Sequence, residues 1–216
     1  MHKIVQNLIN IENKIKSSLN TEKLPKIIAV SKTFPIDKTI PLIEYGHIHF
    51  GENKVQEAID KWTLTKQKHP NLKLHMIGKL QTNKVKFAVK LFDYIHSVDS
   101  EKLAKKISEE QKKISRKLKI FIQVNIGSEN QKSGVNRTKL EQLINFSRGI
   151  GLDIVGVMCI PPLNDNPQIY FREMMKLKEL NNLNDLSMGM TSDYIDACKY
   201  ETTFIRIGSG IFGERS

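Results

Sequence analysis

Lys32 is the residue whose type and position first suggest chemistry in this sequence. It ends the run IIAVSK at residues 27–32, in which four apolar residues and Ser31 precede it. Lysine is rarely buried without a partner, and a partly desolvated amine has a lowered pKa and can form a Schiff base with an aldehyde. A lysine at the end of a strand can equally extend its ammonium group into water. The local sequence leaves both interpretations open.

A glycine-rich segment near the end of the chain is the second candidate. Gly208, Gly210 and Gly213 match the spacing G-x-G-x-x-G, but the dinucleotide fingerprint also needs a following helix and an acidic residue about twenty positions later. Only three residues follow Gly213, so we discard that interpretation. Gly208, Ser209 and Gly210 can instead offer backbone N–H groups and a hydroxyl to a phosphate.

Other reactive residue types form weaker patterns. The six histidines and two cysteines show no zinc-ligand spacing, so we expect no metal site. Cys159 and Cys198 have no base beside them in the sequence, and we expect buried, inert thiols. The loop 127–134 is either a lid over the site or a plain surface turn. The candidate chemistry is therefore an amine together with phosphate-binding loops.

The elements that must position these residues alternate along the chain. Eight short runs predict strands, and several are almost continuously apolar, as expected for parallel strands covered on both faces. These runs lie at residues 27–32, 48–53, 74–78, 94–99, 120–126, 154–159, 186–189 and 203–207. Helical periodicity is found at residues 54–68, 82–92, 101–117, 139–148 and 169–180, and a further helix is expected at about 2–19.

This alternation predicts an α/β fold, a single (β/α)₈ barrel of the TIM type that spans residues 1–216, with the N-terminal helix packed on the barrel. A doubly wound open sheet is the alternative, although it usually has fewer strands at this length. In a barrel the chemistry lies at the carboxyl ends of the strands, and the loops after strands 7 and 8 often bind phosphate. Lys32 and the segments 187–193 and 208–210 all fall there. Helix capping and close packing could explain both segments, but their convergence favours phosphate.

Length and composition suit one intracellular domain. The chain has 216 residues, of which 39% are hydrophobic, and no apolar run reaches the roughly 18 residues that span a bilayer. The N-terminus lacks the features of a signal peptide. With only two cysteines a disulfide scaffold is excluded. We expect a cytoplasmic protein without membrane contact.

The formal net charge of +11 is concentrated in one stretch of the chain. Residues 61–119 hold fifteen Lys, one Arg and five acids, whereas the residues on either side are nearly balanced. A nucleic-acid-binding face shows such a concentration. The chain has 28 Lys but only six Arg, and Arg is preferred for phosphates and base edges. We therefore expect solvated helix faces rather than a nucleic-acid partner.

A series of short motifs begins with AVSK at residues 29–32 and FGEN at 50–53 and continues in order to RIGS at 206–209. Together these motifs resemble the YggS/PROSC family of pyridoxal phosphate homeostasis proteins. Thr191 stands where the family usually has Ser, and Ser209 where it often has Thr, so both positions keep the hydroxyl. The other motifs are IGKLQTNK at 77–84, SVD at 97–99, QVN at 123–125, KSG at 132–134, GVM at 156–158 and SMGM at 187–190.

The resemblance implies a PLP fold type III barrel, related to the N-terminal domain of alanine racemase, with pyridoxal 5′-phosphate (PLP) as cofactor. It implies that Lys32 holds PLP as a Schiff base, that Arg206 faces the pyridine nitrogen and that Asn53 lies close to the cofactor. An Arg there keeps the nitrogen unprotonated, because two adjacent positive charges repel, and this favours storage over broad carbanion catalysis. The phosphate ligands that it implies are Thr191, Gly208 and Ser209, together with Ser187 and Met190.

The resemblance also implies a carrier or regulator that limits free PLP in the cell and so serves vitamin B6 homeostasis. Its partners would be PLP and PLP-dependent apo-enzymes, and it would be a monomer. The alternative is a small PLP-dependent amino-acid racemase or lyase with weak activity. The related racemases complete their active site with a second, β-rich domain, and this chain ends three residues after its last glycine. We therefore expect no robust catalysis.

Overall fold

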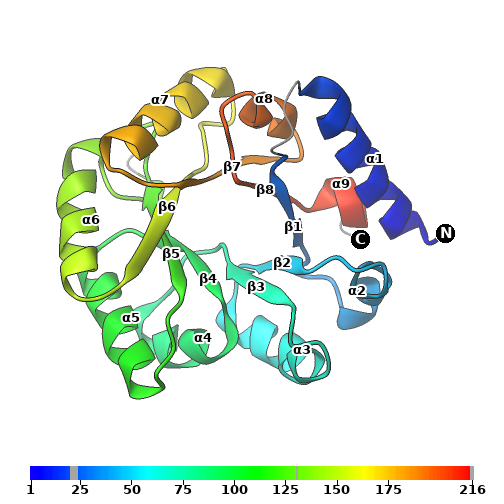
Figure 1. The fold of residues 1–216 in the computed structure, drawn as a ribbon, viewed down its shortest axis with the longest axis horizontal. Coiled ribbons are helices and arrows are strands. Elements are labelled where there is room, and N and C mark those ends of the chain that lie inside the picture. The colour runs from blue at the N-terminus through cyan, green and yellow to red at the C-terminus, as the bar shows by residue number, and fades with distance from the viewer. Residues whose placement is uncertain (20–23, 130, 215–216) are drawn as a thin grey trace.

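The computed structural model describes residues 1–19, 24–129 and 131–214. Within these ranges, eight parallel strands form a closed barrel in which the spatial order follows the sequence. The last strand pairs with the first, so that Ala29 lies beside Ile207 and Lys26 beside Phe204. Figure 1 shows the strands at the centre and the helices around them. The predicted barrel is confirmed, and the alternative of an open sheet is wrong.

The eight strands agree with the eight predicted runs, and no strand end differs from the prediction by more than two residues. They are β1 (Lys26–Val30), β2 (His49–Glu52), β3 (Lys73–Met76), β4 (Tyr94–Val98), β5 (Lys119–Val124), β6 (Asp153–Cys159), β7 (Asp185–Met190) and β8 (Phe204–Ile207).

The long helices also follow the prediction, with two differences. The stretch 82–92 divides into a 3₁₀ turn and a short α-helix, and the helix predicted at 101–117 ends earlier, where Ser115 adopts a φ of 51°. The helices are α1 (Lys3–Ser18), α2 (Ile40–Glu44), α3 (Val55–Lys68), α4 (Val85–Leu91), α5 (Glu101–Lys113), α6 (Leu140–Gly149), α7 (Pro167–Leu180), α8 (Tyr194–Cys198) and α9 (Ser209–Phe212), with 3₁₀ turns η1 (Ile36–Lys38), η2 (Thr82–Lys84) and η3 (Arg137–Lys139). None of the helices in the described ranges could cross a membrane.

The N-terminal helix α1 packs against the barrel where a helix after the last strand would normally lie. The His2 side chain accepts a hydrogen bond from the Ile4 N–H and so caps the helix. Leu8, Ile11 and Ile15 recur at helical spacing and are buried. The helix contacts α2, α8 and α9, so the first and last helices lie side by side (Figure 1).

Side chains of each strand alternate between the barrel interior and the layer beneath the helices. On β1, Ile28 and Val30 belong to the interior cluster, whereas Ile27 and Ala29 belong to the outer core. The alternation directs the next interior position, Lys32, towards the mouth of the barrel. The other buried members of the interior cluster are Tyr94, Phe121, Met158 and Phe204.

Candidate functional site

Lys32 lies two residues after the end of β1 and is half-buried, and the backbone on both sides of it is fixed. Ser31 is fully buried, and its N–H donates to the carbonyl of Gly51 at 3.1 Å. Thr33 adopts a φ of 69°, and its N–H donates to Glu57 Oε1 at 2.5 Å. A threonine in the left-handed region is uncommon and strained. The chain therefore holds the lysine at a defined point of the rim.

A buried carboxylate behind β1 and β2 reinforces this point. Glu52 Oε1 accepts hydrogen bonds from Ser31 Oγ at 2.7 Å, Lys61 Nζ at 2.8 Å and Trp62 Nε1 at 2.9 Å. The Lys61 amine also donates to the Ser31 carbonyl at 2.6 Å. A buried charge must be paired and hydrogen-bonded to be tolerated. The sequence analysis did not predict the roles of Lys61 and Trp62, which lie about two helical turns after the start of α3.

Arg206 lies in the barrel interior and is held by two partners. The guanidinium donates from Nη1 to Ser187 Oγ and from Nη2 to the Cys159 carbonyl, both at 2.8 Å. Its side chain is almost completely buried, and this burial lowers the pKa of Arg206 from its ordinary value. Burial also raises the pKa of the Cys159 thiol to about 12, so this cysteine stays a neutral thiol. A guanidinium has five N–H donors, so the two partners leave donors for a ligand.

Thr191, Gly208 and Ser209 lie together at the ends of β7 and β8. Ser209 Oγ lies 3.4 Å from Thr191 Oγ1, which also lies 3.5 Å from the Gly210 N–H. A one-turn helix, α9, begins at Ser209, although the sequence did not predict it. A Cβ added at Gly208 would meet nothing of the protein closer than 3.6 Å, and that nearest atom is the Val30 carbonyl oxygen. The packing of the protein therefore does not by itself require a glycine at position 208.

The other three predicted site residues occupy different depths. Asn53 follows β2, half-buried, and its buried Oδ1 has no hydrogen-bond partner among the described residues. Met190 ends β7 beside Arg206, and its N–H donates to Asp193 Oδ1 at 2.6 Å. Ser187 is fully buried, and its hydroxyl contacts His96 and Arg206. The structure thus places Ser187 beneath Arg206 rather than on the rim with the other hydroxyls.

Taken together, the eight residues lie in or just after four neighbouring strands. These strands are β7, β8, β1 and β2, which are consecutive around the barrel. Across the mouth, residues 131–134 lie against β5, since Gln123 Nε2 donates to the Ser133 carbonyl at 3.1 Å and the Val135 N–H to the Gln123 carbonyl at 2.8 Å. Gln131, Lys132 and Ser133 line a cavity of about 330 Å³ there, so this segment forms part of the mouth.

Comparisons with known proteins agree with this geometry. Residues 4–216 match the family model described as alanine racemase, N-terminal domain. The pyridoxal phosphate homeostasis protein of Vibrio cholerae is 35% identical over 230 aligned residues, which cover 100% of this chain and 98% of that protein. That of Aquifex aeolicus is 36% identical, covering 90% of this chain and 89% of its own. The chain belongs to the pyridoxal phosphate homeostasis protein family. The resemblance stated from the sequence motifs is confirmed.

Solved structures of this family share the fold. PipY from Synechococcus elongatus PCC7942 gives a TM-score of 0.87 at 33% identity without PLP and 0.85 at 32% identity with PLP bound. Both matches cover 97% of this chain and 100% of PipY. Alanine racemase of Clostridium difficile 630 gives a TM-score of 0.74 at 17% identity, and the match covers 57% of that longer chain. This last similarity shows a shared barrel alone.

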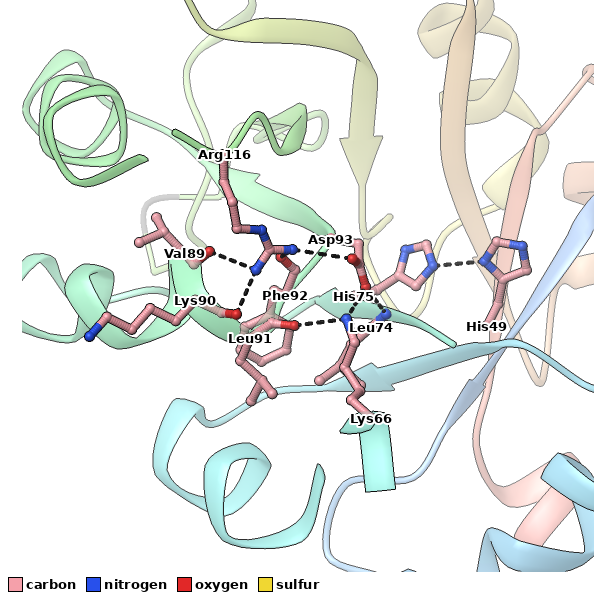
Figure 2. Close-up of polar contacts among 10 residues, drawn as sticks. All are labelled: His49, Lys66, Leu74, His75, Val89, Lys90, Leu91, Phe92, Asp93 and Arg116. Carbon is pink, nitrogen blue, oxygen red and sulfur yellow. Dashed lines mark hydrogen bonds and ion pairs between the residues drawn. The ribbon is translucent and has the colours of Figure 1, made fainter. Parts of the chain in front are cut away.

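The basic stretch 61–119 includes cations that stabilise the fold (Figure 2). Arg116, its one arginine, donates to the carbonyls of Val89, Lys90 and Phe92, which end α4, at 2.5 to 3.1 Å. Asp93 lies 3.3 Å from Arg116 Nη2 and 2.5 Å from Lys66 Nζ. Cations at a helix C-terminus satisfy its last carbonyls. The arginine best suited to bind nucleic acid is thus occupied within the fold.

Proposed function

We propose that this protein binds PLP and acts as a carrier and regulator of free PLP in the cell. The observation that carries the proposal is the placing of a lysine at an interior position of the barrel rim, beside a loop with two hydroxyls and an unobstructed glycine. Lys32 supplies the amine, and Gly208 lies next to Val30 on the neighbouring strand. PipY, which has the same fold at 32% identity, has been solved with PLP bound.

The residues of the rim fit each part of the cofactor. The open space at Gly208 allows a phosphate to approach the backbone closely, and Thr191 and Ser209 offer hydroxyls there. Met190 orders the turn that carries Thr191. Asn53 has a buried oxygen without a partner among the described residues, as a group close to a ligand often has. Ser187, in this proposal, supports Arg206 rather than the phosphate.

PLP supplies an aldehyde that can form a Schiff base and a pyridine ring that can withdraw electrons. The amine of Lys32 would take the aldehyde carbon, with loss of one water, and so retain the cofactor covalently. Arg206 would donate an N–H to the pyridine nitrogen, which must then be unprotonated because an arginine always donates. A neutral ring withdraws electrons weakly, so this arrangement suits the storage of vitamin B6.

We further propose that residues 1–216 act as one domain, as a monomer in the cytoplasm, which delivers PLP to apo-enzymes. Cys159 and Cys198 are both free and buried, which suits a reducing compartment.

The first test replaces the lysine. The wild-type protein mixed with PLP should absorb visible light, and borohydride followed by peptide mapping should place the adduct on Lys32. Lys32→Ala should lose the trapped adduct and keep its circular dichroism, because a single rim side chain contributes little to the core. Lys26→Ala, at the opposite end of β1, is the matched control and should retain the adduct. A trapped adduct at the mouth of the Lys32→Ala protein would show that the assignment is wrong.

The second test concerns the phosphate. Gly208→Val should fold, because the protein leaves space for a Cβ there, but it should place carbon atoms where the phosphate would lie. We expect PLP affinity to fall at least tenfold, with Lys32 still present. Gly149→Ala, where a Cβ would also meet nothing, serves as the control. Equal affinities for Gly208→Val and the wild type would rule out this phosphate site.

A further inference from the structure

Three histidines from consecutive strands are hydrogen-bonded in series inside the barrel. His49 Nδ1 lies 3.0 Å from His75 Nε2, and His75 Nδ1 lies 2.9 Å from His96 Nε2. They belong to β2, β3 and β4. His75 and His96 are completely buried, and His49 is 8% exposed. Figure 2 shows the first of these contacts, between His49 and His75.

The series continues to the arginine of the proposed cofactor site. His96 Nδ1 lies 2.8 Å from Ser187 Oγ, and Ser187 Oγ lies 2.8 Å from Arg206 Nη1. Two aromatic rings hold the imidazoles in place: His75 stacks on Tyr94 and His96 on Phe121, each with centroids 4.3 Å apart. The series of hydrogen bonds therefore runs from the amino end of the barrel to its cofactor-binding end.

Each of the three imidazoles in this hydrogen-bonded series is neutral, and a neutral imidazole has one donor and one acceptor nitrogen. Desolvation lowers the pKa of His49 to about 4 and lowers those of His75 and His96 well below the ordinary value. Two neighbouring rings can bond only if one nitrogen donates and the other accepts. All three histidines must therefore be in the same tautomer, and a change in one requires a change in all.

Ser187 decides which tautomer this is. A guanidinium can only donate, so the serine oxygen accepts from Arg206, and its own hydroxyl hydrogen needs an acceptor. His96 Nδ1 is the acceptor that the described residues provide. The Nε2–H of His96 then donates to His75, and the Nε2–H of His75 donates to His49. The opposite direction would leave the buried hydroxyl hydrogen of Ser187 without a partner in the described part of the chain, which is costly.

We propose that His49, His75, His96 and Ser187 are positioning residues that form one directed hydrogen-bond chain and thereby fix the orientation of the Arg206 guanidinium. The open end of the chain is His49, which lines a cavity of about 260 Å³ together with Glu12, Lys26 and His47 at the amino end of the barrel. The hydrogen-bond chain itself forms without a cofactor. Its effect on the pyridine nitrogen rests on the proposed function.

The direction of the hydrogen-bond chain can be tested first in the protein without PLP. Nitrogen-15 NMR of the histidine side chains should show the Nε2–H tautomer for His49, His75 and His96 at neutral pH. Ser187→Ala removes the group that sets the direction, so the three tautomers should become mixed, even at the distant His49. Ser147→Ala, which removes a buried hydroxyl on α6, should change none of them. Nδ1–H tautomers in the wild type, or unchanged signals in Ser187→Ala, would overturn the proposal.

The effect on the cofactor needs a second measurement, with PLP labelled with nitrogen-15 in its ring. His96→Leu leaves Ser187 without an acceptor, so we expect the ring nitrogen resonance and the visible absorption maximum to shift. His96→Gln, whose side-chain oxygen can accept from Ser187, should restore both. If His96→Leu does not fold, Ser187→Ala serves for the same comparison. Bound PLP with an unshifted ring nitrogen resonance in both His96→Leu and Ser187→Ala would refute the positioning role. A wild-type protein that fails to bind PLP would refute only the proposed function.

Discussion

This fold is most sensitive to acid through four histidines, of which three are buried and His47 is half-buried. His47, His49, His75 and His96 lie at the amino end or in the interior of the barrel, and desolvation is the main cause of the lowered pKa of each. The pKa of His47 and His49 falls to about 4. An unfolded chain would protonate all four near pH 6.5. Folding therefore keeps protons off these rings.

This difference predicts a steep loss of stability in mild acid. Since each folded-state pKa is lower than the unfolded value, the stabilisation is complete above about pH 6.5 and is lost as the pH falls below it. Each histidine contributes about 1.4 kcal/mol per pH unit, so four contribute about 5.5 kcal/mol per unit at most. Urea unfolding followed by circular dichroism at pH 7.5, 6.0 and 5.0 measures the slope.

Two variants separate these histidines from the rest of the chain. His47→Gln should lower the slope by about one histidine's share, roughly 1.4 kcal/mol per pH unit. His69→Gln, at an exposed position, should leave the slope unchanged. A stability that is constant between pH 7.5 and 5.0 would contradict this account.

At the scale of elements, the end of α4 depends on a side chain from beyond α5. Arg116 joins three carbonyls and Asp93 (Figure 2). Its removal leaves these carbonyls to water and weakens the attachment of α5 to α4. We expect Arg116→Ala to lower the free energy of unfolding by about 1–3 kcal/mol, as the loss of charge-assisted hydrogen bonds does. Chemical denaturation gives the value.

The matched control is the neighbouring cation. Lys117→Ala removes an exposed charge and should change the stability by less than about 0.5 kcal/mol. If both variants lose the same stability, net charge rather than helix capping explains the effect.

The sequence predicted the strands and the long helices well and the short helices poorly. Short apolar runs, several of them almost continuous, identified the strands, because parallel strands are buried on both faces. The helices α2, α8 and α9 have four or five residues each, too few for helical periodicity to be recognised. Of these, α9 matters most, since it shapes the loop of Gly208 and Ser209.

At the scale of the whole molecule, the interior polar chain could have been found by a different search. Sequence reasoning examined the histidines for metal-ligand spacing. Within the described ranges, no group of His, Cys, Asp and Glu could hold a metal ion. The signal was the recurrence of one interior histidine in three successive strands, at His49, His75 and His96. His49 pairs with Lys73 and His75 with Tyr94, so each next histidine lies two residues beyond the register partner of the one before. This local pattern does not include Ser187, which lies on β7.

The closure of the barrel between β1 and β8 has a consequence for synthesis of the protein. Lys32 leaves the ribosome about 170 residues before Arg206, Gly208 and Ser209. The strands that carry them pair with each other, so the proposed pocket does not exist until β8 has been synthesised. Nascent chains that lack β8 therefore cannot hold PLP there, however many ribosomes translate one message.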